Sequence, residues 1–272
     1  MTPRKVLFIA QEITPYVPQT NMSVMVKKIP QAIQEMGSEI RTFLPKWGNI
    51  NERRNQLHEV IRLSGMNIII NDTDHPLLIK VASLQSARMQ VYFIDNEDFF
   101  QKRLMVADKK GKEYTDNYER AIFYARSVLE TIKKLRWYPD VIHCQGWVSA
   151  IAPYYIKTAY REEPPFANTK VVFSLYDMPL TKSMPDNFRE CIAFRSITPE
   201  IIDTFGLNFK TTDDLIKLAI NFSDGVVETQ PNTNPEWINF AKTKNIPILE
   251  YNDETENQAQ RFSDFYDSIL NA

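Results

Sequence analysis

Glycine is scarce in this chain, with 7 among 272 residues, where an average usage of ~7% would give about nineteen. Glycine-rich loops that cradle phosphate are therefore few before any motif is sought. Cysteine is scarcer still, and the 2 cysteines cannot form a disulfide framework. This cysteine usage is typical of a reducing compartment, so we expect a cytoplasmic protein.

Three further features are missing. A basic excess is absent, with 32 Lys and Arg against 34 Asp and Glu and a net charge of −2, so we expect no nucleic-acid partner. The N-terminal apolar run, Val6–Ala10, is too short for a secretory signal or a membrane helix. The 3 histidines have no second histidine or cysteine at metal-ligand spacing. We therefore expect no membrane contact, no metal and no cofactor.

Apolar runs and amphipathic stretches alternate along the chain. Lys5–Ala10 is apolar without alternation, as in a strand buried on both faces. Apolar residues then recur at helical spacing from Asn21 to a stop at Gly37. The pattern predicts one α/β domain over residues 1–272, with a Rossmann-like, doubly wound sheet of about seven parallel strands. Further strands are expected at 39–44, 140–143, 170–175, 225–229 and 246–250, and further helices at 116–135, 147–160, 235–243 and 254–272, with two or three more between 187 and 222.

Residues 51–95 differ from this alternation. Short apolar runs are separated there by Gly65 and by the polar segment Asn71–Asp74. Such spacing is typical of strands joined by tight turns. We expect a small β-rich insertion containing a hairpin, with its turn at Asn71–Asp74.

Ligands of an open parallel sheet bind beyond the carboxyl ends of its strands. This rule selects the loops at 11–21, 45–51, 144–148 and 176–184. Glu12 could accept hydrogen bonds from sugar hydroxyls, although capping a neighbouring backbone group is the commoner outcome. His143 is better explained as a buried histidine bonded to neighbouring main chain than as a nucleophile's base or a metal ligand. Asp177 fits a general base and a turn equally well.

Several segments resemble one family in their order and spacing. They are KVLFIAQEITPYVP at 5–18, IRTFLPKWGNI at 40–50, TDNYERAIFYARSVLE at 115–130, PDVIHCQGWVSAIAPYYIK at 139–157, KVVFSLYD at 170–177 and LIKLAINFSDGVVETQP at 215–231. Together they resemble the N-terminal half of bacterial glycogen synthases and plant starch synthases. The resemblance implies a GT-B glycosyltransferase fold, of which this chain is the acceptor-side half. Positions that keep the family's residue are Glu12, Pro15, Pro45, His143, Trp147, Pro153, Lys217 and Asp224.

The family's functional residues are not all kept. Where the family has Lys-x-Gly-Gly to hold the phosphates of a sugar nucleotide, this chain has Pro18, Thr20 and Asn21. The family's His-Asp-Trp-His segment reads Gln145 to Val148 here, and its strand-end His-Asn is replaced by Tyr176 and Asp177. Family members also have a second domain that binds most of the ADP-glucose or UDP-glucose donor, which 272 residues do not accommodate. We therefore expect a domain that is inactive on its own, and no residue is assigned as catalytic.

Three hypotheses follow. The first is a glycogen or starch synthase-like glycosyltransferase domain that is either degenerate or dependent on another chain for its donor domain. The second is a non-catalytic glucan-binding module. The third is a protein-interaction scaffold, in which a protein partner or a second copy covers the face that the donor domain would occupy. A glucan or other carbohydrate is the expected ligand of a cleft whose candidate residues are Glu12, Tyr16, Trp47, His143, Gln145, Trp147, Tyr176 and Asp177. An apolar partner surface is expected at Val17, Pro18, Met22 and Val24.

Overall fold

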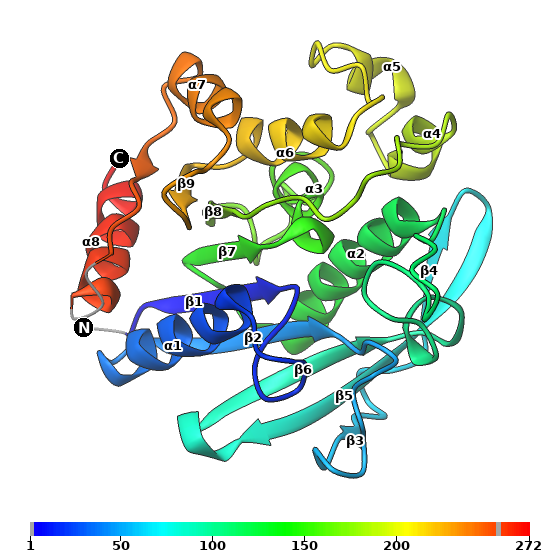
Figure 1. Ribbon diagram of the computed structural model, residues 1–272, viewed down its shortest axis with the longest axis horizontal. Helices are drawn as coiled ribbons and strands as arrows, with labels where there is room; N and C mark the ends of the chain where they lie inside the picture. The colour runs from blue at the N-terminus through cyan, green and yellow to red at the C-terminus, as the bar shows by residue number, and fades with distance from the viewer. Residues whose placement is uncertain (1–2, 254–256) are drawn as a thin grey trace.

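The computed structural model describes residues 3–253 and 257–272. Within them ten strands form one sheet, in the order β10-β9-β8-β7-β1-β2-β6-β5-β3, with β4 paired to β5 (Figure 1). The strands from β10 to β6 in that order all run parallel, which confirms the predicted Rossmann-like sheet. The strands are β1 Lys5–Ala10, β2 Glu39–Pro45, β3 His58–Glu59, β4 Met66–Ile70, β5 Thr73–Leu84, β6 Met89–Asp95, β7 Val141–Gln145, β8 Lys170–Leu175, β9 Gly225–Glu228 and β10 Ile248–Leu249.

Helices cover both faces of this sheet (Figure 1). In the described part of the chain, none of them is long and apolar enough to cross a membrane. The start of the last predicted helix, at residue 254, lies outside the described residues. The α-helices are α1 Asn21–Glu35, α2 Asn117–Leu135, α3 Ala152–Lys157, α4 Phe188–Ile192, α5 Pro199–Asp203, α6 Thr212–Asn221, α7 Pro235–Thr243 and α8 Gln258–Leu270.

The first strand shows why the sheet is buried on both sides. Val6 and Phe8 point into a cluster formed with α1 and α8, whereas Leu7 and Ile9 join the larger core that contains α2, α3 and α6. All four side chains are fully buried. A strand in this position needs apolar residues at every position, because successive side chains point to opposite faces. The continuous apolar run of β1 satisfies this requirement.

Helix α1 begins and ends where the sequence predicts. Thr20 caps its N-terminus, accepting a hydrogen bond from the Ser23 N–H at 2.9 Å, while the Ser23 hydroxyl oxygen accepts one from the Thr20 N–H. Gly37 follows the helix with φ at +98°, a conformation that glycine adopts without strain. The loop after β1 therefore leads directly into a capped helix.

The β-rich segment at 51–95 divides in the structure. β4 and β5 form the expected hairpin, and its turn residues Asn71 and Asp72 have φ at 45° and 61°. The run at 90–94 belongs to β6, which pairs in parallel with β2 and therefore extends the main sheet. Its apolar residues fit either a hairpin or a parallel strand, so pattern alone did not place it.

The helix expected at 147–160 is interrupted. A short 3-10 turn, Trp147–Ser149, precedes α3, which places Pro153 in its first turn. Proline in a helix interior lacks an N–H donor and clashes with the carbonyl four residues earlier, whereas in the first turn it is tolerated. Pro153 therefore marks the start of α3.

Candidate functional site

The four loops selected from the sequence meet at one edge of the sheet. Strands β8, β7, β1 and β2 are consecutive neighbours and all run in the same direction. Gln145 at the end of β7 lies between Ala10 of β1 and Ser174 of β8. This edge is where ligands of doubly wound sheets bind, and every candidate cleft residue lies on or beside it.

The Glu12 side chain is hydrogen-bonded to the N-terminus of α1. Its carboxylate accepts a hydrogen bond from the Thr20 hydroxyl, the N-cap of α1, and the Glu12 side chain is buried. Because Thr20 Oγ1 also accepts from the Ser23 N–H, one of the free donors in the first turn of the helix already has a partner within the chain. The helix N-terminus therefore carries its own cap and carboxylate where an anion would otherwise bind.

Two of the candidate aromatic residues lie beneath the surface. Trp47 is fully buried and Trp147 is 2% exposed. The Trp47 Nε1–H donates to the Gln11 carbonyl at 2.8 Å, and the two indole rings lie 6.4 Å apart. Neither ring face is open to a sugar in this structure, so both act here as packing residues. Tyr16 is similar: its ring meets Phe93 edge to face, and burial raises its pKa to about 12.

Gly146 stands where the family's His-Asp-Trp-His segment has its aspartate, and the local structure leaves no room for a side chain there. Its φ is +86°, and a Cβ added there would lie 2.5 Å from Gln11 Oε1. That oxygen accepts a hydrogen bond from the Trp147 N–H at 3.0 Å. Gln11 therefore fills the space that a side chain at position 146 would need.

His143 is buried between two side-chain hydroxyls. Its Nδ1 lies 2.7 Å from the Tyr266 hydroxyl of α8, and its Nε2 lies 2.7 Å from Ser174 Oγ. The prediction that His143 bonds to neighbouring main chain is therefore wrong, because β8 and α8 both place side-chain hydroxyls against the ring. Full burial lowers the pKa of His143 to about 3, so the ring is neutral and holds α8 on the sheet.

This burial predicts a pH dependence of stability. In the unfolded chain His143 takes up a proton near pH 6.5, but in the folded protein it does so only near pH 3. Its contribution to stability is therefore complete above pH 6.5 and lost as the pH falls. We expect the free energy of unfolding to drop by about 1.4 kcal/mol per pH unit from this group. Urea unfolding at several pH values between about 6 and 4 measures this change. The free energy of unfolding should fall less steeply with pH in His143→Gln than in the unaltered protein, and equal pH dependence would contradict the assignment.

A small pocket opens farther along the same edge. It lies at the ends of β7, β8 and β9, between α1 and α8, and its volume is about 30 Å³. Its walls include Gln145, Tyr176 and Glu228. Gln145 is 1% exposed, and its Oε1 has no hydrogen-bond partner in the described structure. An unpaired buried amide oxygen is costly, and Gln145 can accept a hydrogen bond at this pocket.

Tyr176 and Asp177 are the most accessible of the candidate residues. Tyr176 is half-buried and Asp177 is exposed. Burial, together with the negative charge of Glu12, raises the pKa of Tyr176, so its hydroxyl is protonated and can donate. Asp177 accepts a hydrogen bond from Gln230 Nε2 at 2.7 Å. The structure thus brings Glu12, Tyr176 and Gln145 to one place and leaves Asp177 on its rim.

Only two of the four residues predicted to form an apolar partner surface are accessible. Val17 and Met22 are buried, at 7% and 9% exposure, and belong to the main core. Pro18 is exposed and Val24 is half-buried. The tight turn before α1 folds two of the four side chains inward, so no continuous apolar patch forms here.

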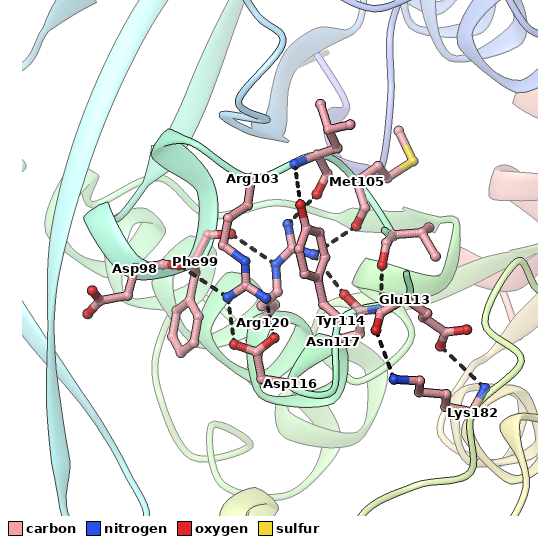
Figure 2. Close-up of polar contacts among 12 residues, drawn as sticks. Asp98, Phe99, Arg103, Met105, Glu113, Tyr114, Asp116, Asn117, Arg120 and Lys182 are labelled. Atoms are coloured by element: carbon pink, nitrogen blue, oxygen red, sulfur yellow. Dashed lines mark hydrogen bonds and ion pairs between the residues drawn. The ribbon is translucent and has the colours of Figure 1, made fainter. Parts of the chain in front are cut away.

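The loop that follows β6 is held by a buried arginine that sequence reasoning missed (Figure 2). Arg120 of α2 is fully buried. Its guanidinium donates to the carbonyls of Phe99, Leu104 and Met105 at 2.8–2.9 Å, and to Asn117 Oδ1 at 2.7 Å. Its charged carbon also lies 5.1 Å from the Trp47 ring. Arg120 therefore fixes this loop against the buried aromatics of the site.

The sequence analysis also missed two contributors to the strand-end pocket, Glu228 and helix α8. Glu228 ends β9 at the same edge, so the strand-end rule could have found it. Helix α8 brings Arg261 and Phe262 to the pocket, and no local signal connects residues so distant in sequence. Among the described residues, no group of three or more His, Cys, Asp or Glu could hold a metal ion.

The arrangement of sheet, helices and strand-end loops is that of one half of a GT-B glycosyltransferase. The starch synthase catalytic domain family matches residues 5–244. This chain belongs to that family, which confirms the resemblance seen in its sequence.

Individual relatives agree with this assignment. The chain is 31% identical to a glycogen synthase of Chlorobaculum parvum over 84% of its own length and 46% of the relative's. It is 32% identical to a Chlorobaculum tepidum glycogen synthase over 83% and 45% of the two lengths. The chain thus spans about half the length of the curated relatives it matches.

A solved structure shares the fold. The catalytic domain of starch synthase IV from Arabidopsis thaliana, solved with ADP and acarbose, superposes with a TM-score of 0.71 at 16% identity. The match covers 95% of this chain and 53% of that one. The comparison supports the GT-B-type architecture of the domain.

Proposed function

We propose that this domain is the acceptor-side half of a glycogen or starch synthase-type glycosyltransferase and that it binds a glucan at the strand-end pocket. The supporting observation is the unpaired, buried amide oxygen of Gln145, which lines this pocket together with Tyr176 and Glu228. These groups can accept from and donate to sugar hydroxyls. A volume of about 30 Å³ holds a water or two, so a sugar ring lies at the pocket mouth, with its hydroxyls directed inward.

Transfer of glucose requires more than this pocket. A sugar nucleotide's diphosphate must be bound and its departing charge stabilised. The loop before α1 offers no lysine and no glycine for this purpose, and its helix N-terminus is already capped by Thr20 with the Glu12 carboxylate beside it. We propose that residues 1–272 are inactive alone and that transfer depends on a donor half outside them.

The relatives support a carbohydrate ligand. The Arabidopsis starch synthase carries ADP and acarbose, a saccharide analogue, in its catalytic domain. By analogy of fold, the saccharide-binding role is the part that this chain retains. The non-catalytic glucan-binding module is therefore the second candidate, and it shares the same pocket. The scaffold hypothesis loses support because Val17 and Met22 are buried.

Calorimetric titration with maltoheptaose tests this proposal. We expect binding in the millimolar range for the unaltered protein and at least about tenfold weaker binding for Tyr176→Ala, equivalent to ~1.4 kcal/mol. Tyr138→Ala is the matched control, since Tyr138 is 49% exposed and precedes β7 at the opposite edge of the sheet. Equal affinities of the Tyr176→Ala and Tyr138→Ala proteins would reject the pocket as the glucan site.

A further inference from the structure

Helix α2 carries two buried arginines with different surroundings. Arg120 has four hydrogen-bond acceptors around it. Arg126 is 5% exposed, yet within residues 3–253 and 257–272 it makes one hydrogen bond, from Nη1 to the Ile69 carbonyl, and no ion pair. Its Nε is buried without a partner. A guanidinium has five N–H donors, so most of those on Arg126 have no acceptor within the described protein.

Arg126 borders a groove of about 680 Å³ that none of the loop residues bonded to Arg120 lines. The β4–β5 hairpin forms one wall, and the segment from α4 to α5 forms the other. Phe194 holds the guanidinium in place, with its ring centre 3.7 Å from the charged carbon. Ile69 is 53% exposed in the hairpin wall, one of few large apolar side chains so exposed in the described structure. The groove thus combines a fixed donor with an open apolar surface.

The charges around the groove do not favour an anion. Arg195 is already paired, lying 2.8 Å from Glu163 and 3.8 Å from Glu130. Asp72 and Glu190 are exposed carboxylates on the groove walls. They repel an anionic ligand and instead accept hydrogen bonds from hydroxyl groups. A neutral ligand with many hydroxyls satisfies both these acceptors and the donors of Arg126.

We propose that this groove is a second saccharide-binding site, separate from the strand-end pocket. Arg126 donates to sugar hydroxyl oxygens, Asp72 and Glu190 accept from sugar hydroxyls, and Ile69 packs against the apolar face of a sugar ring. The inference takes its ligand class from these groups, and it extends the proposed glucan binding to residues that the strand-end pocket does not use. A glucan bound in the groove would contact none of the residues that line the strand-end pocket.

Amide chemical shifts recorded by NMR during a maltoheptaose titration test this site directly. Ligand in the groove should shift the resonances of residues 67–69 and 193–195, whereas ligand in the strand-end pocket should shift those of 176 and 228. Arg126→Met should weaken the groove response at least about tenfold and leave the strand-end response unchanged. Ile69→Ser should also weaken it, and since Ile69 is exposed, this variant keeps the fold.

The controls separate the two proposals. Arg161→Met removes an arginine whose side chain is 71% exposed and which lies outside the groove, and it should change neither response. A groove response that persists in Arg126→Met, or no response at 67–69 and 193–195, would overturn the second site whatever happens at the strand ends. Citrate serves as the anionic probe. Tighter binding of citrate than of maltoheptaose, lost in Arg126→Met, would show an anion site and reject the saccharide.

Discussion

Replacing Arg120 with methionine should lower the free energy of unfolding by about 3–5 kcal/mol. The substitution removes donors from three carbonyls and from the Asn117 side chain at once, and the methionine side chain, buried in place of Arg120, has no donor to replace them. The loop after β6 then loses its attachment to α2. Urea unfolding followed by circular dichroism measures the change.

Arg126→Met provides a matched control on the same helix. Arg126 is also buried but gives up one hydrogen bond, to Ile69. An apolar side chain of similar length removes its unpaired donors, so we expect a change within about 1 kcal/mol. Equal losses for the two variants would mean that burial of the side chain, rather than its hydrogen bonds, determines stability here.

Asp95→Asn should cost about 3 kcal/mol. Asp95 is fully buried at the end of β6, where its carboxylate lies 2.8 Å from the Lys80 ammonium. Glu52 lies 2.7 Å from the same ammonium and 2.9 Å from that of Lys46, so four charges form one network. Asparagine keeps the shape but removes one negative charge, which leaves two buried lysines with one carboxylate.

The exposed pair of Arg161 and Glu162 supplies the comparison for this prediction. Their side chains are 71% and 85% exposed, and exposed ion pairs contribute little. Glu162→Gln should therefore leave the unfolding curve unchanged under the same conditions. A similarly small effect for Asp95→Asn would show that the Lys80 charge is satisfied by Glu52 alone.

The fold could be predicted from sequence because its signals are local. The apolar run of β1, the helical spacing that begins at Asn21 and the stop at Gly37 each depend on neighbouring residues alone, and the order of strands and helices follows from such signals. The strand at 90–94 was harder, because an apolar run of that length suits both a hairpin and a parallel strand. Its partner β2, nearly fifty positions earlier, decides the matter.

The site was predictable only in part. The strand-end rule selected the edge at which the proposed pocket lies and therefore Gln145 and Tyr176, which line it. It did not reveal that Trp47 and Trp147 are buried, since an aromatic residue after a strand can turn inward or outward. The hydroxyl of Tyr266 on His143 depends on a contact across 123 positions, which no local pattern encodes.

Titration of one protein preparation with maltoheptaose and then with ADP-glucose tests the central claim most directly. The strand-end pocket and the capped, glycine-free loop before α1 predict heat of binding for maltoheptaose and none for ADP-glucose. ADP-glucose binding with a Kd on the order of tens of micromolar, about −6 to −7 kcal/mol, would contradict the account, because phosphate would then be held beside Thr20 and Glu12.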